Sequence, residues 1–470
     1  MHNIKINKWL LLYWLIAIIA IWLVRNNVFF WDTVQLGAKH AHWYYENNFK
    51  YLLLPEEIDS GHPPIFGMYL AALWKISGKS LTVSHFAMLP FVLGIIYFLL
   101  QIGKYLVNEK YAPLLVLLNL LDPTLAAQCL LISPDVILVC FFLMGLYAVL
   151  EQKNWLKTIA MLGLAMISMR GMMVVMILFL LEITIYSNSW QNLLRTSIQK
   201  VKYYIPAGLF ALAFLVFHYQ QTGWIGYHSD SPWSPSFARV DAKGFFKNIA
   251  VLGWRMLEFG RIFMWIILII IVLQKKFQDW WQDATFRSLF SLFIFSILLL
   301  TPSLLLHQGL SAQRYLLPIY LSITFLVFYL IFNYLQYKKN RSIAFMIAFV
   351  GLSTGNLWIY PDKISQGWDA TLAHLPYYQL RAQMLNFIEQ ESIPPDSIGT
   401  AFPEIGPFKF KDLSDRTEGF VEKDLQKQDY ILYSNVMNDF TDNEIDNLFK
   451  YWSPIKTYKN QGVRVVLYKK

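Results

Sequence analysis

Apolar runs of roughly membrane-spanning length recur along the first 360 residues, and they constrain the fold more than any other feature of the chain. Only 15% of the 470 residues are charged, which is too few to coat a soluble globule of this size. We therefore expect an integral membrane protein, an all-α bundle of about eleven transmembrane helices. The expected spans are residues 9–24, 84–106, 114–125, 132–150, 158–169, 172–186, 204–218, a run that ends at Lys275, 286–306, 314–334 and 343–358.

The Lys and Arg clusters between these spans all fall on one side of the expected bundle. Lys5 and Lys8 precede the first span, and Lys104, Lys275 and Lys338 mark the same side later in the chain. Because cytoplasmic loops carry the excess of Lys and Arg, we expect a cytoplasmic N-terminus and an external loop after the first span. No small-residue cleavage site follows the first span, so we expect it to be retained.

The external segment after the first span, residues 25–80, is much longer than an ordinary connection between helices. Pro63-Pro64 opens the run IFGMYLAALWKI, which is too short to cross a bilayer and is expected to form a helix on the membrane surface. An interfacial loop with its aromatic side chains among lipid headgroups is one interpretation. The number of titratable side chains favours an active loop instead. They are Asp32, His40, His42, Glu46, Glu56, Glu57, Asp59 and His62.

Residues 360–470 differ from residues 1–359 because their composition is that of an ordinary soluble protein. Helical periodicity at 380–391, the buried-strand pattern DYILYSNV, a short helix at NEIDNLFKYW and a final strand at GVRVVLYK predict a small α/β domain. The topology places this domain outside the membrane, beside the first loop. It contains no recognisable metal or nucleotide motif, and we expect it to act as a lid or to contact the acceptor.

Charge and cysteine content exclude two further classes. The net charge of +9 comes from short basic clusters between apolar runs, where orienting the helices explains them better than a nucleic-acid partner. Cys129 and Cys140 lie eleven residues apart in apolar sequence. We therefore expect buried thiols and no disulfide framework.

Three features are expected on the external face: the acid-rich first loop, the Arg170-Gly171 turn between two short spans, and the segment HQGLSAQRYLLP. Together with AKHAHWYYEN, GHPPIFGMYLAALWKISG, ISPDVILVCFFLMGLY and GLAMISMRGMMV, in this order, they cover most of residues 25–330. The chain resembles the GT-C glycosyltransferases that use polyprenyl-phosphate sugars, specifically the protein O-mannosyltransferase and lipid A aminoarabinose transferase group. The resemblance implies a GT-C fold, a polyprenyl-phosphate sugar donor and an acceptor lipid, glycan or protein at the outer face of a bacterial inner membrane.

Two positions depart from the family pattern. Family members often have Asp-Glu where this chain has Asp32-Thr33, so any role of the second acid is absent or is supplied elsewhere. A lysine is common where His62 precedes the paired prolines, so a fixed positive charge at that point is in doubt at neutral pH.

The chemistry of sugar transfer assigns roles to four residues. Displacing a phosphate at the anomeric carbon requires cations for the leaving group and, with a hydroxyl acceptor, a carboxylate base. We expect Asp32 to be that base, with direct displacement and inversion as the resemblance implies. Arg170 and Arg314 are candidates for the donor phosphate, and Tyr315 could hydrogen-bond the same group. A helix cap for Asp32 and snorkelling arginines at helix ends are the simpler interpretations.

Asp59, His62 and Asp135 are expected to support the loop or to orient the acceptor. Asp135 follows a proline at a helix start, where a cap is the simpler interpretation. Asp59 and His62 could hold a metal, but one Asp–His pair is weak evidence. We therefore assign no metal ligands and no cofactor, and leave open whether a divalent ion takes part.

Arg255, Glu258 and Arg261 are spaced at i, i+3 and i+6, which predicts ion pairs within one helix. The sequence Trp280-Trp281-Gln282-Asp283 superficially resembles a motif of oligosaccharide-transferring enzymes, but it falls on the expected cytoplasmic side.

A membrane glycosyltransferase is the function we expect, and a multispan transporter or lipid flippase is the alternative. Transporters carry ionisable residues near the middle of helices and repeat symmetry between halves. Here the candidate residues cluster at the outer ends of spans, and we find no convincing repeat. A non-catalytic scaffold would not need an acid-rich first loop. The sequence leaves the sugar and the acceptor open.

Overall fold

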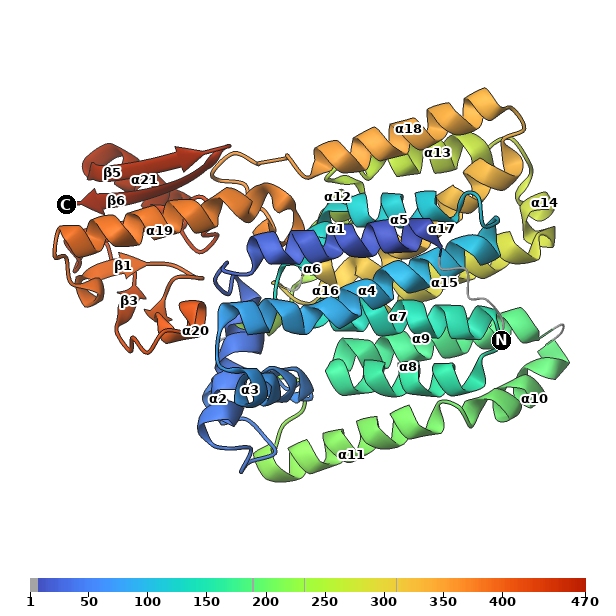
Figure 1. Cartoon of the computed structure of the whole chain (residues 1–470), viewed down its shortest axis with the longest axis horizontal. Coiled ribbons are helices and arrows are strands. Elements are labelled where there is room, and N and C mark those ends of the chain that lie inside the picture. Colours follow the sequence, from blue (N-terminus) through green and yellow to red (C-terminus); the bar gives the residue numbers. More distant parts are fainter. Residues whose placement is uncertain (1–6, 188–189, 232, 310) are drawn as a thin grey trace.

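The computed structural model describes residues 7–187, 190–231, 233–309 and 311–470. Lys5, which helped to orient the expected topology, lies outside these residues. Apart from the helices of the first loop, the described helices before residue 356 form one bundle, and the strands lie together beyond one end of it (Figure 1). The bundle contains α1 (Lys8–Val24), α4 (Leu81–Leu106), α5 (Ala112–Leu121), α6 (Pro123–Leu130), α7 (Pro134–Leu150), α8 (Asn154–Ile167), α9 (Met169–Tyr186), α10 (Trp190–Val201), α11 (Ile205–Thr222), α12 (Ala242–Leu257), α13 (Ile262–Val272), α14 (Phe277–Gln282), α15 (Ala284–Leu300), α16 (Pro302–Leu306), α17 (Leu317–Tyr334) and α18 (Lys338–Gly355).

Every expected span contains helix, but the helices differ in length. By length and hydropathy alone, four segments among the described residues could cross a membrane: Leu81–Leu106, Met169–Tyr186, Ala284–Leu306 and Gln313–Tyr334. Counting each bent pair, α5 with α6 and α10 with α11, as one span brings the number to six. The all-α bundle of apolar helices is thus confirmed, while the count of eleven spans stays a prediction.

Burial separates central from peripheral helices of the bundle. All side chains of α17 from Leu317 to Phe332 are buried, so this helix forms the centre. On α1, large apolar side chains such as Leu15 and Leu23 are 54% and 73% exposed. A helix that is apolar all round and exposed on one side is suited to lipid rather than to water. The outer helices therefore explain the unusually apolar composition.

The first loop contains two helical segments that lie near the same end of the bundle as the strands (Figure 1). A π-helical turn (Val34–Lys39) continues into α2 (His40–Glu46), as the predicted helical stretch requires. The short helix predicted after the paired prolines is α3 (Ile65–Ser77). It crosses α2 closely at Gly67, where a Cβ atom would lie 2.5 Å from the Cβ of His40. A glycine is needed for this approach.

The C-terminal segment forms a six-stranded sheet in the order β2-β3-β1-β4-β6-β5. β1 is parallel to β3 and β4, whereas β6 is antiparallel to β4 and β5. The predicted helices and strands all occur, as α19, β4, α21 and β6. The elements of the segment are α19 (Leu375–Gln390), β1 (Ile398–Thr400), β2 (Gly406–Pro407), α20 (Lys409–Asp412), β3 (Gly419–Glu422), β4 (Tyr430–Ser434), α21 (Asp442–Tyr451), β5 (Ser453–Asn460) and β6 (Val463–Lys469).

Two hydrophobic cores hold the molecule together, one in the bundle and one around the sheet. Phe30 and Leu131 belong to the sheet core although they come from the first loop and from the turn before α7. The Phe30 ring stacks on His374, with 5.1 Å between ring centroids. The first loop is thereby fixed against the C-terminal segment. Cys129 and Cys140 are buried free thiols, as expected.

Candidate active site

Arg314 lies at the centre of a buried ionic cluster to which separate parts of the chain contribute. It belongs to a short 3-10 turn (Gln313–Leu316) directly before α17. Its guanidinium donates hydrogen bonds to Asp32 and Asp369, and its Nε lies 3.4 Å from Oδ2 of Asp135. Asp32 follows α1, Asp135 lies in the first turn of α7, and Asp369 lies beyond α18. The first loop, the bundle and the C-terminal segment therefore meet at one cation.

Arg170 brings a second cation to the same place. It donates a hydrogen bond to Asp135, and its guanidinium carbon lies 4.1 Å from the centroid of the Tyr315 ring. The hydroxyl of Tyr315 accepts a hydrogen bond from Nη2 of Arg314 at 3.1 Å. The three residues predicted to bind the donor phosphate are thus neighbours in the folded chain.

The start of α9 explains the position of Arg170. Ser168 caps this helix, and its Oγ accepts a hydrogen bond from the Gly171 backbone N–H at 3.0 Å. A Cβ atom on Gly171 would lie 1.9 Å from the carbonyl oxygen of Leu164 in α8. Only glycine allows α8 and α9 to approach this closely, so the Arg-Gly pair both turns the chain and presents the arginine.

The ionic cluster has no spare positive charge. Two arginines face three aspartates, so its formal charge is −1 when all five groups are ionised. Burial raises the pKa of the Asp369 carboxyl, and the adjacent Arg314 opposes this shift. Both guanidinium groups are engaged by carboxylates. A phosphate bound here would share its hydrogen-bond donors with Asp32 and Asp135.

Asp135 does not cap its helix, so the simpler interpretation of this residue is wrong. Ser133 takes the capping position, and its Oγ accepts a hydrogen bond from the Asp135 backbone N–H at 3.2 Å. Asp135 is therefore free to contact both arginines. Thr33, which replaces the family's second acid, is also accounted for, because its Oγ1 accepts a hydrogen bond from the Phe30 backbone N–H at 2.9 Å.

A cavity of about 590 Å³ opens beside the ionic cluster. Its wall combines aromatic faces with polar groups, the combination typical of sites for small polar ligands. Burial raises the pKa of the Asp439 carboxyl in this wall, and Lys423 opposes the shift. The lining includes Asp32, Arg314 and Tyr315 from the cluster, Trp31, Tyr227, Trp233 and Phe237 from the loops, and Phe402, Glu422, Asn438 and Asp439 from the C-terminal segment.

Among the three aspartates, Asp32 has the best access to this cavity. Its side chain is 24% exposed, whereas those of Asp135 and Asp369 are 5% and 4% exposed. Asp135 and Asp369 do not line the cavity. Of these carboxylates, Asp32 is therefore the one able to meet an acceptor.

His62 lines the same cavity and a smaller one of about 30 Å³ shared with Asp135 and Arg170. Burial and the nearby positive charge of Arg170 lower the pKa of His62 to about 4. The ring is therefore neutral at pH 7, and the doubt about a fixed positive charge at this position is justified.

Asp59 supports the loop rather than the ionic cluster. Its carboxylate accepts hydrogen bonds from the Gly61 backbone N–H at 2.8 Å and from Nε2 of His218 at 3.0 Å. Its partner is thus a histidine of α11 and not His62, so the suggestion that Asp59 and His62 share a metal finds no support in the geometry.

The prediction that Arg255, Glu258 and Arg261 form one intrahelical set is wrong in part. Arg255 does pair with Glu258 at 3.0 Å, but Arg261 makes two hydrogen bonds of 2.8 Å to Asp122, the cap of α6. The reason is a break after α12, where Phe259 and its following glycine have positive φ angles of 53° and 79°. Because α12 ends before this break, Arg261 does not lie on the same helix as Arg255, as the i, i+6 spacing assumes.

Sequence reasoning missed the contributions of the C-terminal segment. Asp369, Glu422 and Asp439 lie in stretches without a recognised motif. For Asp369 one signal existed, because it is a carboxylate shortly after the last apolar run, on the same expected side as the first loop. The other two lie at the end of a strand and in a loop, where sequence spacing does not indicate a shared cavity.

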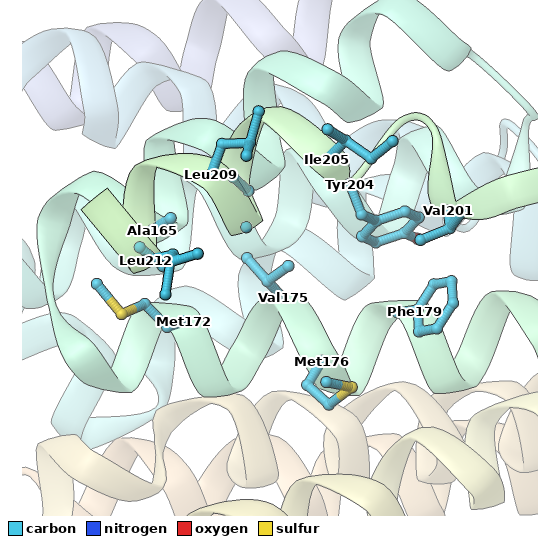
Figure 2. A pocket seen from close by; sticks show the side chains of 13 residues that line it. Ala165, Met172, Val175, Met176, Phe179, Val201, Tyr204, Ile205, Leu209 and Leu212 are labelled. Atoms are coloured by element: carbon cyan, nitrogen blue, oxygen red, sulfur yellow. The ribbon is translucent and has the colours of Figure 1, made fainter. Parts of the chain in front are cut away.

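An apolar groove of about 440 Å³ lies within the bundle (Figure 2). One side is a stripe of α9 formed by Met172, Val175, Met176 and Phe179, which are spaced at i, i+3, i+4 and i+7 and so share a helix face. The facing wall comes from α11. The stripe begins two residues after Arg170 but lies on the opposite side of α9, because 3.6 residues make one turn of the helix.

Comparisons with known proteins agree with the predicted resemblance. Residues 61–219, about a third of the chain, match the family model described as dolichyl-phosphate-mannose-protein mannosyltransferase. The whole chain also matches the crystal structure of ArnT from Cupriavidus metallidurans bound to undecaprenyl phosphate, with a TM-score of 0.55 over 98% of each chain at 9% sequence identity. The chain has the ArnT fold. Searching curated protein sequences gives no match.

The fold match extends over the segments that form the site, whereas the family model covers only some of them. His62, Asp135 and Arg170 lie within the matched residues 61–219, and Asp32 and Arg314 lie outside them. The resemblance to GT-C glycosyltransferases predicted from the sequence is confirmed. This fold and the apolar helices together support an integral membrane protein.

Proposed function

We propose that the chain is an integral membrane glycosyltransferase that transfers a sugar from a polyprenyl-phosphate donor to an acceptor at the extracytoplasmic face. The observation that carries this proposal is the large cavity with Asp32, Arg314 and Tyr315 in its wall. The mannosyltransferase family model supports sugar transfer. The likeness to ArnT, whose structure contains undecaprenyl phosphate, supports the donor class.

The donor phosphate is assigned to Arg170, Arg314 and Tyr315. These side chains offer guanidinium donors and a hydroxyl within one cluster, and arginine can contact a phosphate through two N–H groups at once.

Asp32 is the proposed base. It accepts the proton of the acceptor hydroxyl while that oxygen attacks the anomeric carbon. The bond between the anomeric carbon and the phosphate oxygen breaks, and its electron pair stays on the phosphate. Arg170 and Arg314 compensate the charge that develops there. A single displacement of this kind inverts the anomeric centre.

The charges of the site do not favour the transporter alternative. A transporter or flippase carries ionisable groups near the middle of its helices. Here Asp135 and Arg170 lie in the first turns of α7 and α9, and Arg314 lies directly before α17. Each is at a helix end beside the cavity or the ionic cluster.

The proposal is tested by transfer of label from a panel of radiolabelled polyprenyl-phosphate sugars, with a membrane extract from the source as acceptor. Purified wild type is compared with Asp32→Asn and with Asp415→Asn, which changes a fully exposed carboxylate. We expect Asp32→Asn to lose about 10²–10⁴-fold in rate with donor binding retained, and Asp415→Asn to behave as the wild type.

Two outcomes would change the proposal. Unchanged transfer by Asp32→Asn would keep the enzyme but remove Asp32 as base. Failure of the wild type both to transfer any sugar and to bind any polyprenyl-phosphate carrier would favour the transporter or flippase.

A further inference from the structure

A second buried hydrogen-bond network lies next to the ionic cluster, at the point where α12 ends. Its centre is the carboxylate of Glu258, which is 3% exposed and accepts hydrogen bonds from side chains far apart in the sequence. The donors are Nε2 of Gln313 at 2.8 Å, the Tyr360 hydroxyl at 2.6 Å, Nη1 of Arg255 at 3.0 Å and Nε1 of Trp254 at 3.1 Å. Neither Glu258 nor these donors line the large cavity, so any role in ligand binding is indirect.

Gln313 connects this network to the proposed phosphate site, because it directly precedes Arg314. Both residues belong to the 3-10 turn Gln313–Leu316, which continues without a break into α17. A central helix thus fixes the C-terminal end of the turn, whereas its N-terminal end follows the connection from α16. Gln313 is placed to fix this other end.

The side-chain amide of Gln313 is held at both of its polar atoms. Its Nε2 donates to Oε1 of Glu258, and its Oε1 lies so close to Gly367 that a Cβ atom on that glycine would overlap it. Gly367 precedes the turn that contains Asp369, a hydrogen-bond partner of Arg314. Because the amide is 1% exposed and enclosed on both sides, it restricts rotation of the turn and directs Arg314 toward the ionic cluster.

The backbone around Glu258 is shaped to present its carboxylate at this point. The residue caps the C-terminal end of α12, and the next residue, Phe259, has a φ angle of 53°, which is uncommon outside glycine. Phe259 is fully buried, and its ring stacks on Tyr360 with 5.8 Å between ring centroids. Packing therefore maintains an unfavourable backbone conformation next to Glu258. Such conformations cluster at functional sites.

We propose that Glu258 is a positioning residue for the donor phosphate, which acts through Gln313 to hold the Arg314 guanidinium at the cavity. This role rests on the proposed function, in which Arg314 binds that phosphate. A carboxylate suits the role because hydrogen bonds to a charged group are stronger than those between neutral groups. Glutamine at this position would offer one acceptor oxygen instead of two, and its NH₂ group would point at present donors.

The test measures binding of undecaprenyl phosphate and of undecaprenol, which lacks the phosphate, to the purified full-length protein in detergent. We expect Glu258→Gln to bind undecaprenyl phosphate about tenfold more weakly than the wild type, the effect of losing one hydrogen bond to a charged group. Binding of undecaprenol should not change, because Arg314 is assigned to the phosphate alone. A loss of general stability would instead weaken the binding of both ligands.

Asp241→Asn is the matched control for this substitution. It makes the same change from carboxylate to amide at the other end of α12, where Asp241 is exposed and caps the helix. Asparagine caps a helix about as well as aspartate. This variant should therefore bind both ligands as the wild type does.

Gln313→Met tests the same link while leaving the other contacts of Glu258 in place, and it serves if Glu258→Gln does not fold. Methionine adapts to the space of the glutamine side chain but has no amide. We expect it to weaken undecaprenyl phosphate binding about tenfold as well. The double variant should bind no more weakly than Gln313→Met alone, because both changes interrupt one connection.

Four results would contradict this role of Glu258. If the wild type bound undecaprenyl phosphate no better than undecaprenol, the proposed function would fail together with this role. If the wild type preferred the phosphate and Glu258→Gln retained that preference in full, only this role would fail. Equal weakening for both ligands would show that Glu258 only stabilises the bundle. Additive losses in the double variant would show that it does not act through Gln313.

Discussion

Arg314 is the cation that contacts all three aspartates of the ionic cluster and compensates part of their negative charge. Replacing it with glutamine leaves Asp32, Asp135 and Asp369 facing one another, with Arg170 as the remaining cation of the cluster. Removing one partner of a buried ionic group typically costs about 3–5 kcal/mol, because the remaining charges are not compensated. We expect Arg314→Gln to lower the thermal unfolding midpoint in detergent and to abolish binding of polyprenyl phosphate.

A second substitution separates these two effects. Adding Asp369→Asn to Arg314→Gln removes one excess negative charge and should restore part of the lost stability. Binding should stay absent, because the arginine itself is assigned to the phosphate. A single variant as stable as the wild type would contradict the central role of this cation.

His62 should make the protein less stable in acid. The folded pKa of about 4 is below the value of about 6.5 in an unfolded chain, so between these values the unfolded state binds more protons. The stability that this residue contributes is present above pH 6.5 and is lost as the pH falls toward 4, to a total of about 3 kcal/mol. His62→Gln should therefore reduce the fall of the unfolding midpoint over this range.

His40 and His374 have pKa values that burial lowers to about 4 as well, so His62→Gln should reduce the acid dependence without removing it. Unfolding midpoints measured at half-unit steps from pH 4 to 7 check this. A slope identical to that of the wild type would show that His62 is not one of the titrating groups.

At the residue scale, the sequence predicts which residues belong to the site better than it predicts which of them contact one another. Asp32, Arg170 and Arg314 could be chosen because each is a charged residue at the end of an apolar run. A charge next to a membrane-spanning segment is energetically costly and often serves a function. That Asp369 would contact Arg314 could not be predicted, because their contact depends on how the C-terminal segment folds back on the bundle. Periodicity reports local structure and contains no information on such pairings.

At the scale of the elements, the close contact between α8 and α9, which positions Arg170, requires a glycine at position 171. Gly171→Ala would place a methyl group against the carbonyl oxygen of Leu164, and neither backbone can move alone. We expect this change to cost several kcal/mol and to displace Arg170, since overpacking at tight contacts typically costs about 1–3 kcal/mol and backbone contacts adapt less. Thermal unfolding and donor binding should both be impaired.

Gly253→Ala is the matched control for this change. Gly253 also lies inside a helix, but a Cβ atom there has no neighbour within 4 Å. Alanine is favoured over glycine in a helix by up to about 1 kcal/mol, so this variant should be as stable as the wild type or slightly more stable. Equal effects of the two substitutions would contradict the close crossing of α8 and α9.

At the element scale, apolar periodicity locates helices well but does not report their bends. Pro123 directly follows Asp122, and the helices on either side meet at 77°. The break after α12 likewise changes the partner of Arg261. In the C-terminal segment, β1, β2, β3 and β5 were not predicted from the sequence. The longest of these is β5, SPIKTYKN, whose exposed edge position requires no apolar alternation.

At the scale of the whole molecule, two adjacent residues connect the two hydrophobic cores. Phe29 belongs to the bundle core and Phe30 to the sheet core, although they are adjacent in sequence. The first loop therefore contributes to both parts at the same point from which Asp32 extends toward the cavity. We propose residue 360 as the boundary between these parts, and the relative position of the two cores then determines the geometry of the site.

This adjacency provides a test of how the two parts are held together. Phe29→Ala and Phe30→Ala each remove a buried ring, which typically costs about 3–5 kcal/mol. Only Phe30→Ala removes the contact with His374 and Tyr377, so only this variant should loosen the C-terminal segment from the bundle. We expect faster tryptic cleavage at Lys363, which is 46% exposed at the junction, and a loss of transfer activity. Equal cleavage of the two variants at Lys363 would show that general destabilisation, rather than the Phe30 contact, controls the junction.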